Sequence, residues 1–139
     1  MQENKLNKPN KDFESWHKIK KDIESNLKSK WLRPREVWWV SLGVNVGVEE
    51  DGKGVNFLRP VLVLKVFGAD SALTVSLTSK KKIGKFYFEV GKVGETQEIS
   101  IAIISQVRIL DTKRFVEKVG KLDGEIFTQV KKSITDLLL

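Results

Sequence analysis

The fold of this chain is decided by residues 36–67, which read EVWWVSLGVNVGVEEDGKGVNFLRPVLVLKVF. Two apolar runs, Val37–Leu42 and Pro60–Phe67, stand in it and are dense in Val and Trp, which suit the pleated surface of a sheet. Gly-rich turn chemistry separates the runs, so both are predicted to be strands of one sheet. Proline fits the first position of a strand, where the ladder needs no N–H donor, so the second strand is expected to begin at Pro60.

The loop between the two runs is the first candidate functional position. It carries Glu49, Glu50 and Asp51, and it ends at Arg59, directly before the second strand. Loops held on a rigid sheet are where binding and catalysis concentrate. The alternative is structural, because Arg59 could instead pair with one of the loop acids.

The composition limits the classes of function. The chain has 139 residues, enough for one domain with a real core, and it has no cysteine, which excludes disulfides and thiol catalysis. The net charge of +7 and the pI of about 9.6 favour a polyanionic partner, either nucleic acid or an acidic protein segment. No apolar run approaches the roughly 18 residues of a membrane span. The polar start MQENKLNKPNKD is not a secretory signal, so the cytoplasm is the expected compartment.

Helical patterns stand near both ends of the chain. Residues 1–11 are polar and are predicted to be disordered. An amphipathic helix is expected over Asp12–Lys30, and a second one is expected to begin near Asp123 or Gly124. The second helix has an apolar face made by Phe127, Val130, Ile134 and Leu137.

The segment between the helices has the pattern of short strands and turns. Five strands are predicted, near residues 36–42, 60–67, 72–78, 85–90 and 100–109. Asp111 can cap a short helical turn over Thr112–Glu117. The segment Lys118–Leu122 is short and could add an edge strand. The outline is a small, strongly bent antiparallel sheet or half-barrel with a helix at each end.

Five pieces of the sequence, read in order, carry a family resemblance: EVWWVSLGVNVGVEEDGKG, FLRPVLVL, LTVSLTSK, GKFYFEV and IISQVRILDTKRFVEKVGKLDGEIF. They resemble the MazF/PemK/Kid toxins of bacterial type II toxin–antitoxin systems over about residues 35–138. The resemblance implies a mostly β fold, an SH3-like barrel of the CcdB/PemK type with a C-terminal helix. The chain then divides into a disordered N-terminus (1–11), an N-terminal helical extension (12–34) and the barrel domain (35–139).

The same resemblance implies an activity and its partners. These toxins are metal-independent, sequence-specific endoribonucleases that act as homodimers on single-stranded RNA and need no cofactor. The 2′-hydroxyl attacks the neighbouring phosphorus and leaves a cyclic phosphate and a 5′-hydroxyl. An acidic antitoxin neutralises the toxin, operator DNA is contacted only through that antitoxin, and no membrane is involved.

Three residues match the catalytic positions of the family. Arg59 matches the Arg of the RP motif, and its guanidinium fork suits a phosphoryl oxygen. Thr78 matches the Thr beside that Arg. Without the resemblance, a Thr at the end of a strand could equally be explained by its β-propensity or by a hydrogen bond in a turn. Glu49 matches the Glu of the G-x-E loop, where it would act as an acid–base group or orient Arg59, with a solvated loop acid as the alternative. The family usually follows that Glu with Gln, whereas Glu50 stands here.

RNA-binding positions are expected near the end of the third strand and on the fifth. A basic run with four lysines stands at residues 80–85, and a strand carrying Phe86, Tyr87 and Phe88 follows it. Alternation predicts Tyr87 as the exposed ring of this strand, with Phe86 and Phe88 in the core. The alternative for the basic run is a solvated hairpin tip, and for Arg108 an ion pair with Asp111. The expected RNA-binding residues are Ser79, Lys80, Lys81, Lys82, Lys85, Tyr87, Gln106 and Arg108.

Two features restrict the mechanism. Several family members place an acid just before the Gln of the SQ-x-R motif, and some use it in catalysis, but Ser105 stands here. His17 is the only histidine, so a two-histidine acid–base pair is excluded. The rival interpretation is a non-catalytic barrel that binds RNA, or that inhibits a protein target such as gyrase, as the related CcdB toxins do. Such an inhibitor would use the end of the C-terminal helix, where Asp136–Leu139 has the pattern of packing residues.

Overall fold

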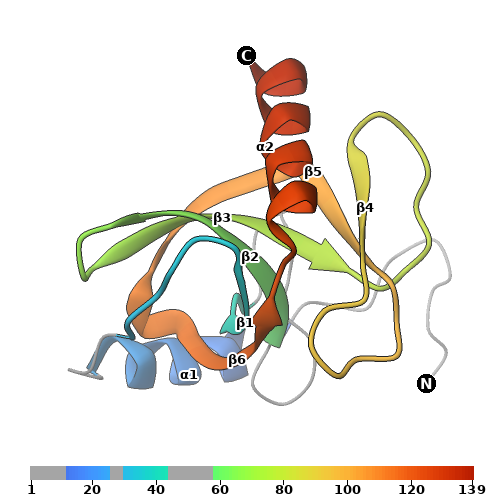
Figure 1. Ribbon diagram of the computed structural model, residues 1–139. Coiled ribbons are helices and arrows are strands. Elements are labelled where there is room, and N and C mark those ends of the chain that lie inside the picture. The colour runs from blue at the N-terminus through green and yellow to red at the C-terminus, as the bar shows by residue number, and fades with distance from the viewer. Residues whose placement is uncertain (1–11, 26–29, 44–57) are drawn as a thin grey trace, which may run out of the picture.

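The computed structural model describes residues 12–25, 30–43 and 58–139, which form one bent sheet with a helix below it and a helix above it (Figure 1). The predicted disorder of residues 1–11 and the acidic loop with Glu49, Glu50 and Asp51 lie outside these ranges. In chain order the elements are α1 (Phe13–Ser25), β1 (Glu36–Ser41), β2 (Leu58–Phe67), β3 (Ser71–Thr78), β4 (Tyr87–Gly91), β5 (Ser100–Asp111), the 3₁₀ turn η1 (Thr112–Arg114), β6 (Phe115–Lys121) and α2 (Gly124–Leu138).

The six strands form an antiparallel sheet in the order β4-β5-β3-β2-β1-β6. This confirms the predicted fold class, mostly β with a strongly bent antiparallel sheet, and the sheet is not closed. Among the described strands, β4 pairs only with β5 and β6 pairs only with β1. Shifts in register interrupt the β1–β6 and β3–β5 pairs, and such bulges bend a sheet.

The two edges of the sheet approach each other without pairing. Gly94, in the loop after β4, has a φ of 62°, and a Cβ there would overlap the backbone carbonyl of Val119 on β6. Only glycine permits this approach, since it has no Cβ and tolerates a positive φ. The loop of residues 92–99 therefore rests on the opposite edge of the sheet.

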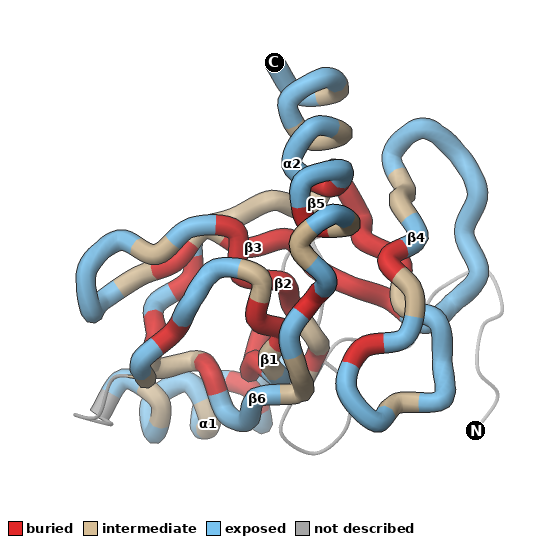
Figure 2. The backbone as a smooth tube through the Cα atoms, in the orientation of Figure 1, coloured by how far each residue is buried: buried red, intermediate tan, exposed pale blue. Residues whose placement is uncertain are grey.

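Most residues in the middle of β2 are buried and are coloured red in Figure 2, and they belong to core clusters on both faces of the sheet. Leu62 and Leu64 pack in one core cluster with Val75, Leu77 and the buried residues of α2. The alternate residues, Val61 and Val63, pack in a second cluster with Val40, Phe115 and Leu32. Because successive residues of a strand point to opposite faces, a strand buried on both sides has a continuous apolar run.

The helix α2 begins where the sequence predicts. Asp123 is its N-cap, and its carboxylate accepts hydrogen bonds from the backbone N–H groups of Glu125 (3.1 Å) and Ile126 (3.3 Å). Phe127 and Val130 are buried in the core under the first half of the helix. Leu137 is partly buried, but Leu138 and Leu139 are exposed, so only part of the predicted packing at the C-terminal end is present.

Several predicted boundaries are wrong by a few residues. The strand β2 begins at Leu58, before Pro60. Pro60 pairs with Trp39 on β1, but the pairing of β2 with β3 starts only at Val61. Pro60 therefore has a neighbouring strand on one side only, and a missing N–H is tolerated at such a position. The turn capped by Asp111 ends at Arg114, and the edge strand β6 begins at once, earlier than predicted.

The aromatic triplet at β4 also differs from the prediction. The strand begins at Tyr87, so Phe86 lies in the preceding turn, where strand alternation does not apply. Phe86 is therefore exposed, whereas Tyr87 and Phe88 are half-buried and Phe88 packs on the core.

The extension helix α1 is fixed to the sheet mainly by one side chain. Trp16 is buried, and it lies so close to Gly43 that a Cβ there would overlap its indole ring. The Arg114 guanidinium lies 5.7 Å from the Trp16 ring, and its Nη1 donates to the carbonyl of Ser41 at the end of β1 (3.2 Å). Trp16 thus joins the extension to both η1 and the end of β1.

We expect Trp16→Ala to lower the free energy of unfolding by about 3 kcal/mol, since a buried aromatic is lost and a cavity is left. The matched control is Phe13→Ala on the same helix, where the side chain is exposed and the change is expected within roughly 0.5 kcal/mol. Thermal or urea unfolding of both variants measures the difference. Equal effects would show that α1 is not anchored through Trp16.

A second prediction concerns Glu36, which is buried at the start of β1. Burial alone would raise the pKa of this carboxyl. It is outweighed by hydrogen bonds from Lys118 (2.8 Å), Trp38 Nε1 (3.1 Å) and the Arg33 N–H (2.9 Å), so the net pKa lies below 4.5. A lowered folded-state pKa contributes stability that is full above pH 4.5 and is lost as the pH falls through the folded value.

Glu36→Gln is therefore expected to destabilise the protein by about 1 kcal/mol at pH 7, because the ionised partner of Lys118 is lost. The difference from the wild type should shrink below pH 4.5, as measured by urea unfolding over a pH series. The control is Glu89→Gln, an exposed change on β4. A difference that stays constant down to pH 3 would contradict the assignment.

Candidate active site

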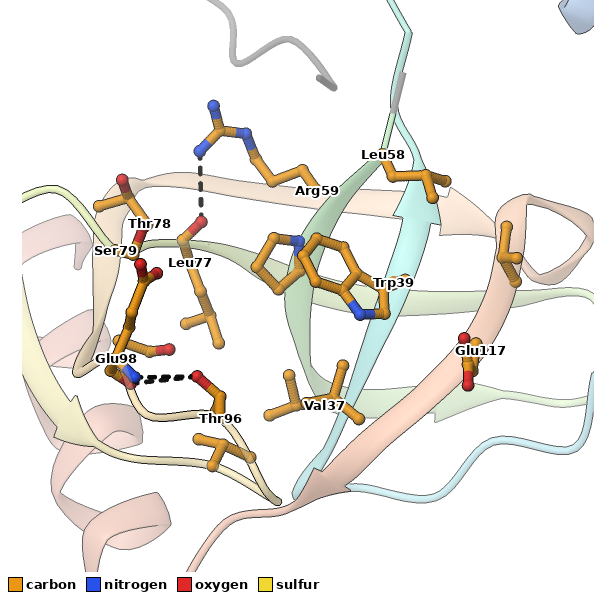
Figure 3. Close-up of a pocket in the computed structure, with 15 residues that line it drawn as sticks. Val37, Trp39, Leu58, Arg59, Leu77, Thr78, Ser79, Thr96, Glu98 and Glu117 are labelled. Atoms are coloured by element: carbon orange, nitrogen blue, oxygen red, sulfur yellow. Dashed lines mark hydrogen bonds between the residues drawn. The ribbon is translucent and has the colours of Figure 1, made fainter. Parts of the chain in front are cut away.

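A pocket of about 570 Å³ opens between the central strands and the loop of residues 92–99 (Figure 3). Its volume lies in the range of ligand sites. Its walls come from five strands, β1, β2, β3, β5 and β6, which meet there because the sheet is bent, and from that loop. The lining residues are Val37, Trp39, Leu58, Arg59, Pro60, Leu77, Thr78, Ser79, Val93, Thr96, Glu98, Ser100, Val116, Glu117 and Val119.

Arg59 is brought to this pocket by the register between β2 and β3. The β2–β3 ladder begins with the pair Val61 and Ser76, and Arg59 and Thr78 lie two residues beyond this pair on their strands. The Arg59 side chain is buried, and its Nη1 donates a hydrogen bond to the carbonyl of Leu77 (3.2 Å). Figure 3 shows the guanidinium reaching along the end of β3, on the side where Thr78 lies. A buried guanidinium held by a backbone carbonyl is a fixed positive group at the pocket wall.

Thr78 ends β3 beside Arg59 and is itself buried. Its Oγ1 accepts a hydrogen bond from the backbone N–H of Lys80 (3.2 Å), which fixes the turn that follows. A hydroxyl that accepts one bond still carries one hydrogen to donate. Ser79 is exposed next to it at the pocket rim. Arg59, Thr78 and Ser79, which sequence reasoning selected, therefore share one wall of one pocket.

The pocket also includes a residue that sequence reasoning missed. Glu98 lies in the loop after β4, where its N–H donates to Thr96 Oγ1 (3.1 Å). In Figure 3 its side chain lies on the same side of the pocket as Ser79 and Thr78 and points toward them. The sequence shows only an acid in a polar loop, so no local pattern could have placed it in the pocket of Arg59.

The remaining wall is mostly apolar. Trp39 is the exposed member of the Trp38–Trp39 pair and lines the pocket beside Pro60, whereas Trp38 points the other way and packs edge-on against Phe115. Glu117 lies on β6, across the pocket from Arg59 (Figure 3). An exposed indole in a pocket with a fixed guanidinium suits a ligand that has both a flat ring and a phosphate.

The lysines predicted to bind RNA lie directly beyond the pocket. Lys80, Lys81 and Lys82 follow Thr78 and Ser79 as exposed residues of the β3–β4 connection. Lys85 lies over the exposed ring of Phe86, with its Nζ 5.1 Å from the centroid. This connection therefore presents both cations and an aromatic face next to the pocket.

Gln106 and Arg108 lie elsewhere on β5 and are not among the described residues that line this pocket. The carbonyl of Arg108 accepts a hydrogen bond from Thr74 (3.0 Å). Burial lowers the pKa of Arg114, and the nearby charge of Arg108 lowers it further, whereas Asp111 raises it. Arg108 thus lies in the charged surroundings of Arg114. Ser105 is exposed on the same strand, and Glu49 falls outside the described ranges.

Comparison with known proteins identifies the fold family. The model of the PemK-like, MazF-like toxin of type II toxin–antitoxin systems matches residues 33–138. The chain belongs to this family. The match confirms the resemblance carried by the RPVLV, LTS and SQ-x-R segments. No curated protein matches the toxin in sequence.

Solved structures of MazF-type toxins have the same fold. MazF from Deinococcus radiodurans is 21% identical, with a TM-score of 0.61, and the match covers 78% of this toxin and 98% of that chain. A mycobacterial endoribonuclease in complex with its cognate antitoxin is 11% identical, with a TM-score of 0.60, over 78% and 95% of the two chains. A MazE–MazF complex from Deinococcus radiodurans is 19% identical, with a TM-score of 0.55, over 78% and 97%.

The described parts of the toxin contain neither a candidate metal site nor a candidate membrane-spanning helix. Within them, no three His, Asp or Glu side chains gather closely enough to hold a metal ion. None of the helices described is both long and apolar enough to cross a membrane.

Proposed function

We propose that this toxin is an endoribonuclease that cleaves single-stranded RNA, with Arg59 and Thr78 at the reaction centre. The observation that carries the proposal is the buried guanidinium of Arg59, held beside the Thr78 hydroxyl in a pocket of a MazF-like fold. The similar mycobacterial protein is an endoribonuclease, which supports the same activity here.

Cleavage through the 2′-hydroxyl places a specific demand on the site. The oxygen attacks the neighbouring phosphorus, and the extra negative charge that develops on the phosphoryl oxygens must be stabilised. A preorganised guanidinium does this well, because its cost of orientation is met when the protein folds. Thr78 donates a further hydrogen bond to the same phosphate. The products are a 2′,3′-cyclic phosphate and a 5′-hydroxyl, and neither step calls for a metal ion.

The partners follow from the same assignment. The net charge of +7 and the lysines beyond Thr78 attract the RNA backbone, and the rings of Trp39 and Phe86 can stack bases. The toxin acts as a homodimer in the cytoplasm, and an acidic antitoxin neutralises it by covering the RNA groove. Solved MazF-type toxins in complex with an antitoxin support this regulation.

We expect the purified toxin to cut a long single-stranded RNA in EDTA into discrete fragments with 5′-hydroxyl ends. Arg59→Ala should lower the cleavage rate by about 100-fold or more, the usual loss for one charge-stabilising donor. The control is Arg33→Ala, an exposed arginine outside the pocket, which should cleave normally. Intact RNA at high concentrations of folded protein would refute the activity and favour a non-catalytic RNA binder or a CcdB-like inhibitor.

The lysines after Thr78 give a second expectation. Replacing Lys80, Lys81 and Lys82 together by Gln should weaken RNA binding and reduce the slope of log K against log salt by about 2, at about 0.7 for each phosphate contact. The control replaces Lys18, Lys20 and Lys21 on α1 by Gln, which removes the same charge at exposed positions away from the pocket. An equal reduction in both variants would show that the basic turn has no local role.

A further inference from the structure

Among the described residues, no group has yet been assigned to accept the proton of the 2′-hydroxyl, and the predicted acid–base residue Glu49 lies outside the described ranges. The family position for an acid before Gln106 holds Ser105, which is exposed on β5 and is not among the described lining residues of the pocket. Two carboxylates do line the pocket in the described chain, Glu98 and Glu117. A carboxylate in reach of the attacking hydroxyl is a general base that accelerates such a reaction by about 100-fold to 10,000-fold.

We propose that Glu98 is this general base, an inference that rests on the proposed ribonuclease function. Its side chain lies on the same side of the pocket as Ser79 and Thr78 and points toward them, whereas Glu117 lies across the pocket on β6 (Figure 3). A phosphate held by Arg59 and Thr78 places the neighbouring ribose inside the pocket, on the side that Glu98 faces. The carboxylate that several family members carry at the position of Ser105 is thus supplied in this chain by the loop before β5.

The loop that carries Glu98 is held firmly enough for this role. Val93 is buried in the core at the start of the loop, and Gly94 packs against the backbone of Val119. The Thr96 hydroxyl donates to the Glu98 carbonyl (3.4 Å) and accepts from the Glu98 N–H (3.1 Å). The strand β5 begins at Ser100, two residues after Glu98. Anchors on both sides limit the positions that the carboxylate can take, as a catalytic base requires.

The proposed step balances in atoms and charge. A Glu98 carboxylate oxygen takes the proton of the 2′-hydroxyl, while the 2′-oxygen forms its bond to phosphorus. The bond from phosphorus to the 5′-oxygen breaks, its electron pair stays on that oxygen, and the oxygen takes a proton from water. Glu98 then returns its proton to water. Arg59 stabilises the charge on the phosphoryl oxygens throughout.

The decisive variant is Glu98→Gln, which keeps the shape of the side chain but cannot accept the proton. We expect its cleavage rate at saturating RNA to fall about 100-fold or more. Binding to a fully 2′-O-methylated RNA of the same sequence, which cannot be cleaved, should be unchanged or tighter, since a negative charge beside the phosphate is removed. Glu98→Asp should retain more activity than Glu98→Gln.

The control is Glu95→Gln, an exposed acid of the same loop that is not among the lining residues. If the wild type cleaves RNA and Glu98→Gln cleaves equally fast, Glu98 is not the base, although the ribonuclease function stands. If Glu98→Gln loses cleavage and binding in parallel, or melts at a lower temperature, the residue is structural and the inference fails. If the wild type does not cleave, the ribonuclease function fails first, and the inference fails with it.

Discussion

The antiparallel register between β2 and β3 is the constraint on which the site depends. It pairs Val61 with Ser76, and Arg59 and Thr78 lie two residues beyond this pair on β2 and β3. On β3, Val75 and Leu77 enter one core cluster, while Thr74 and Ser76 are buried on the other face. A slip of one residue would exchange these two sets and put hydroxyls in place of Val75 and Leu77.

The bend of the sheet creates the pocket, which a flat sheet could not form. Bulges between β1 and β6 and between β3 and β5 curl the sheet until the loop of residues 92–99 rests on β6 at Gly94. The pocket forms between that loop and the ends of β2 and β3. Burying Arg59 there costs desolvation, which the hydrogen bond to Leu77 partly offsets. The result is a guanidinium oriented before any substrate arrives.

The extension helix is connected to this site through the backbone. Trp16 packs on Gly43, and Arg114, over the same indole, donates to the carbonyl of Ser41. Ser41 pairs with Leu58, the neighbour of Arg59. The helix itself was predictable, because its apolar residues repeat at helical spacing. Its docking was not, since nothing local to Gly43 indicates that the indole of Trp16, 27 residues earlier in the chain, will cover it.

By itself the sequence determined the family, the order of the strands along the chain and the capped start of α2 at Asp123, and it selected Arg59 and Thr78 as candidates, because periodicity, caps and motif order are local properties. It misplaced strand ends such as Leu58 and Tyr87, where pairing with a distant strand sets the boundary. Only the tertiary structure decided that the sheet stays open and that Glu98 shares a pocket with Arg59. Both depend on contacts between segments far apart in the chain, and no short stretch of residues encodes such a contact.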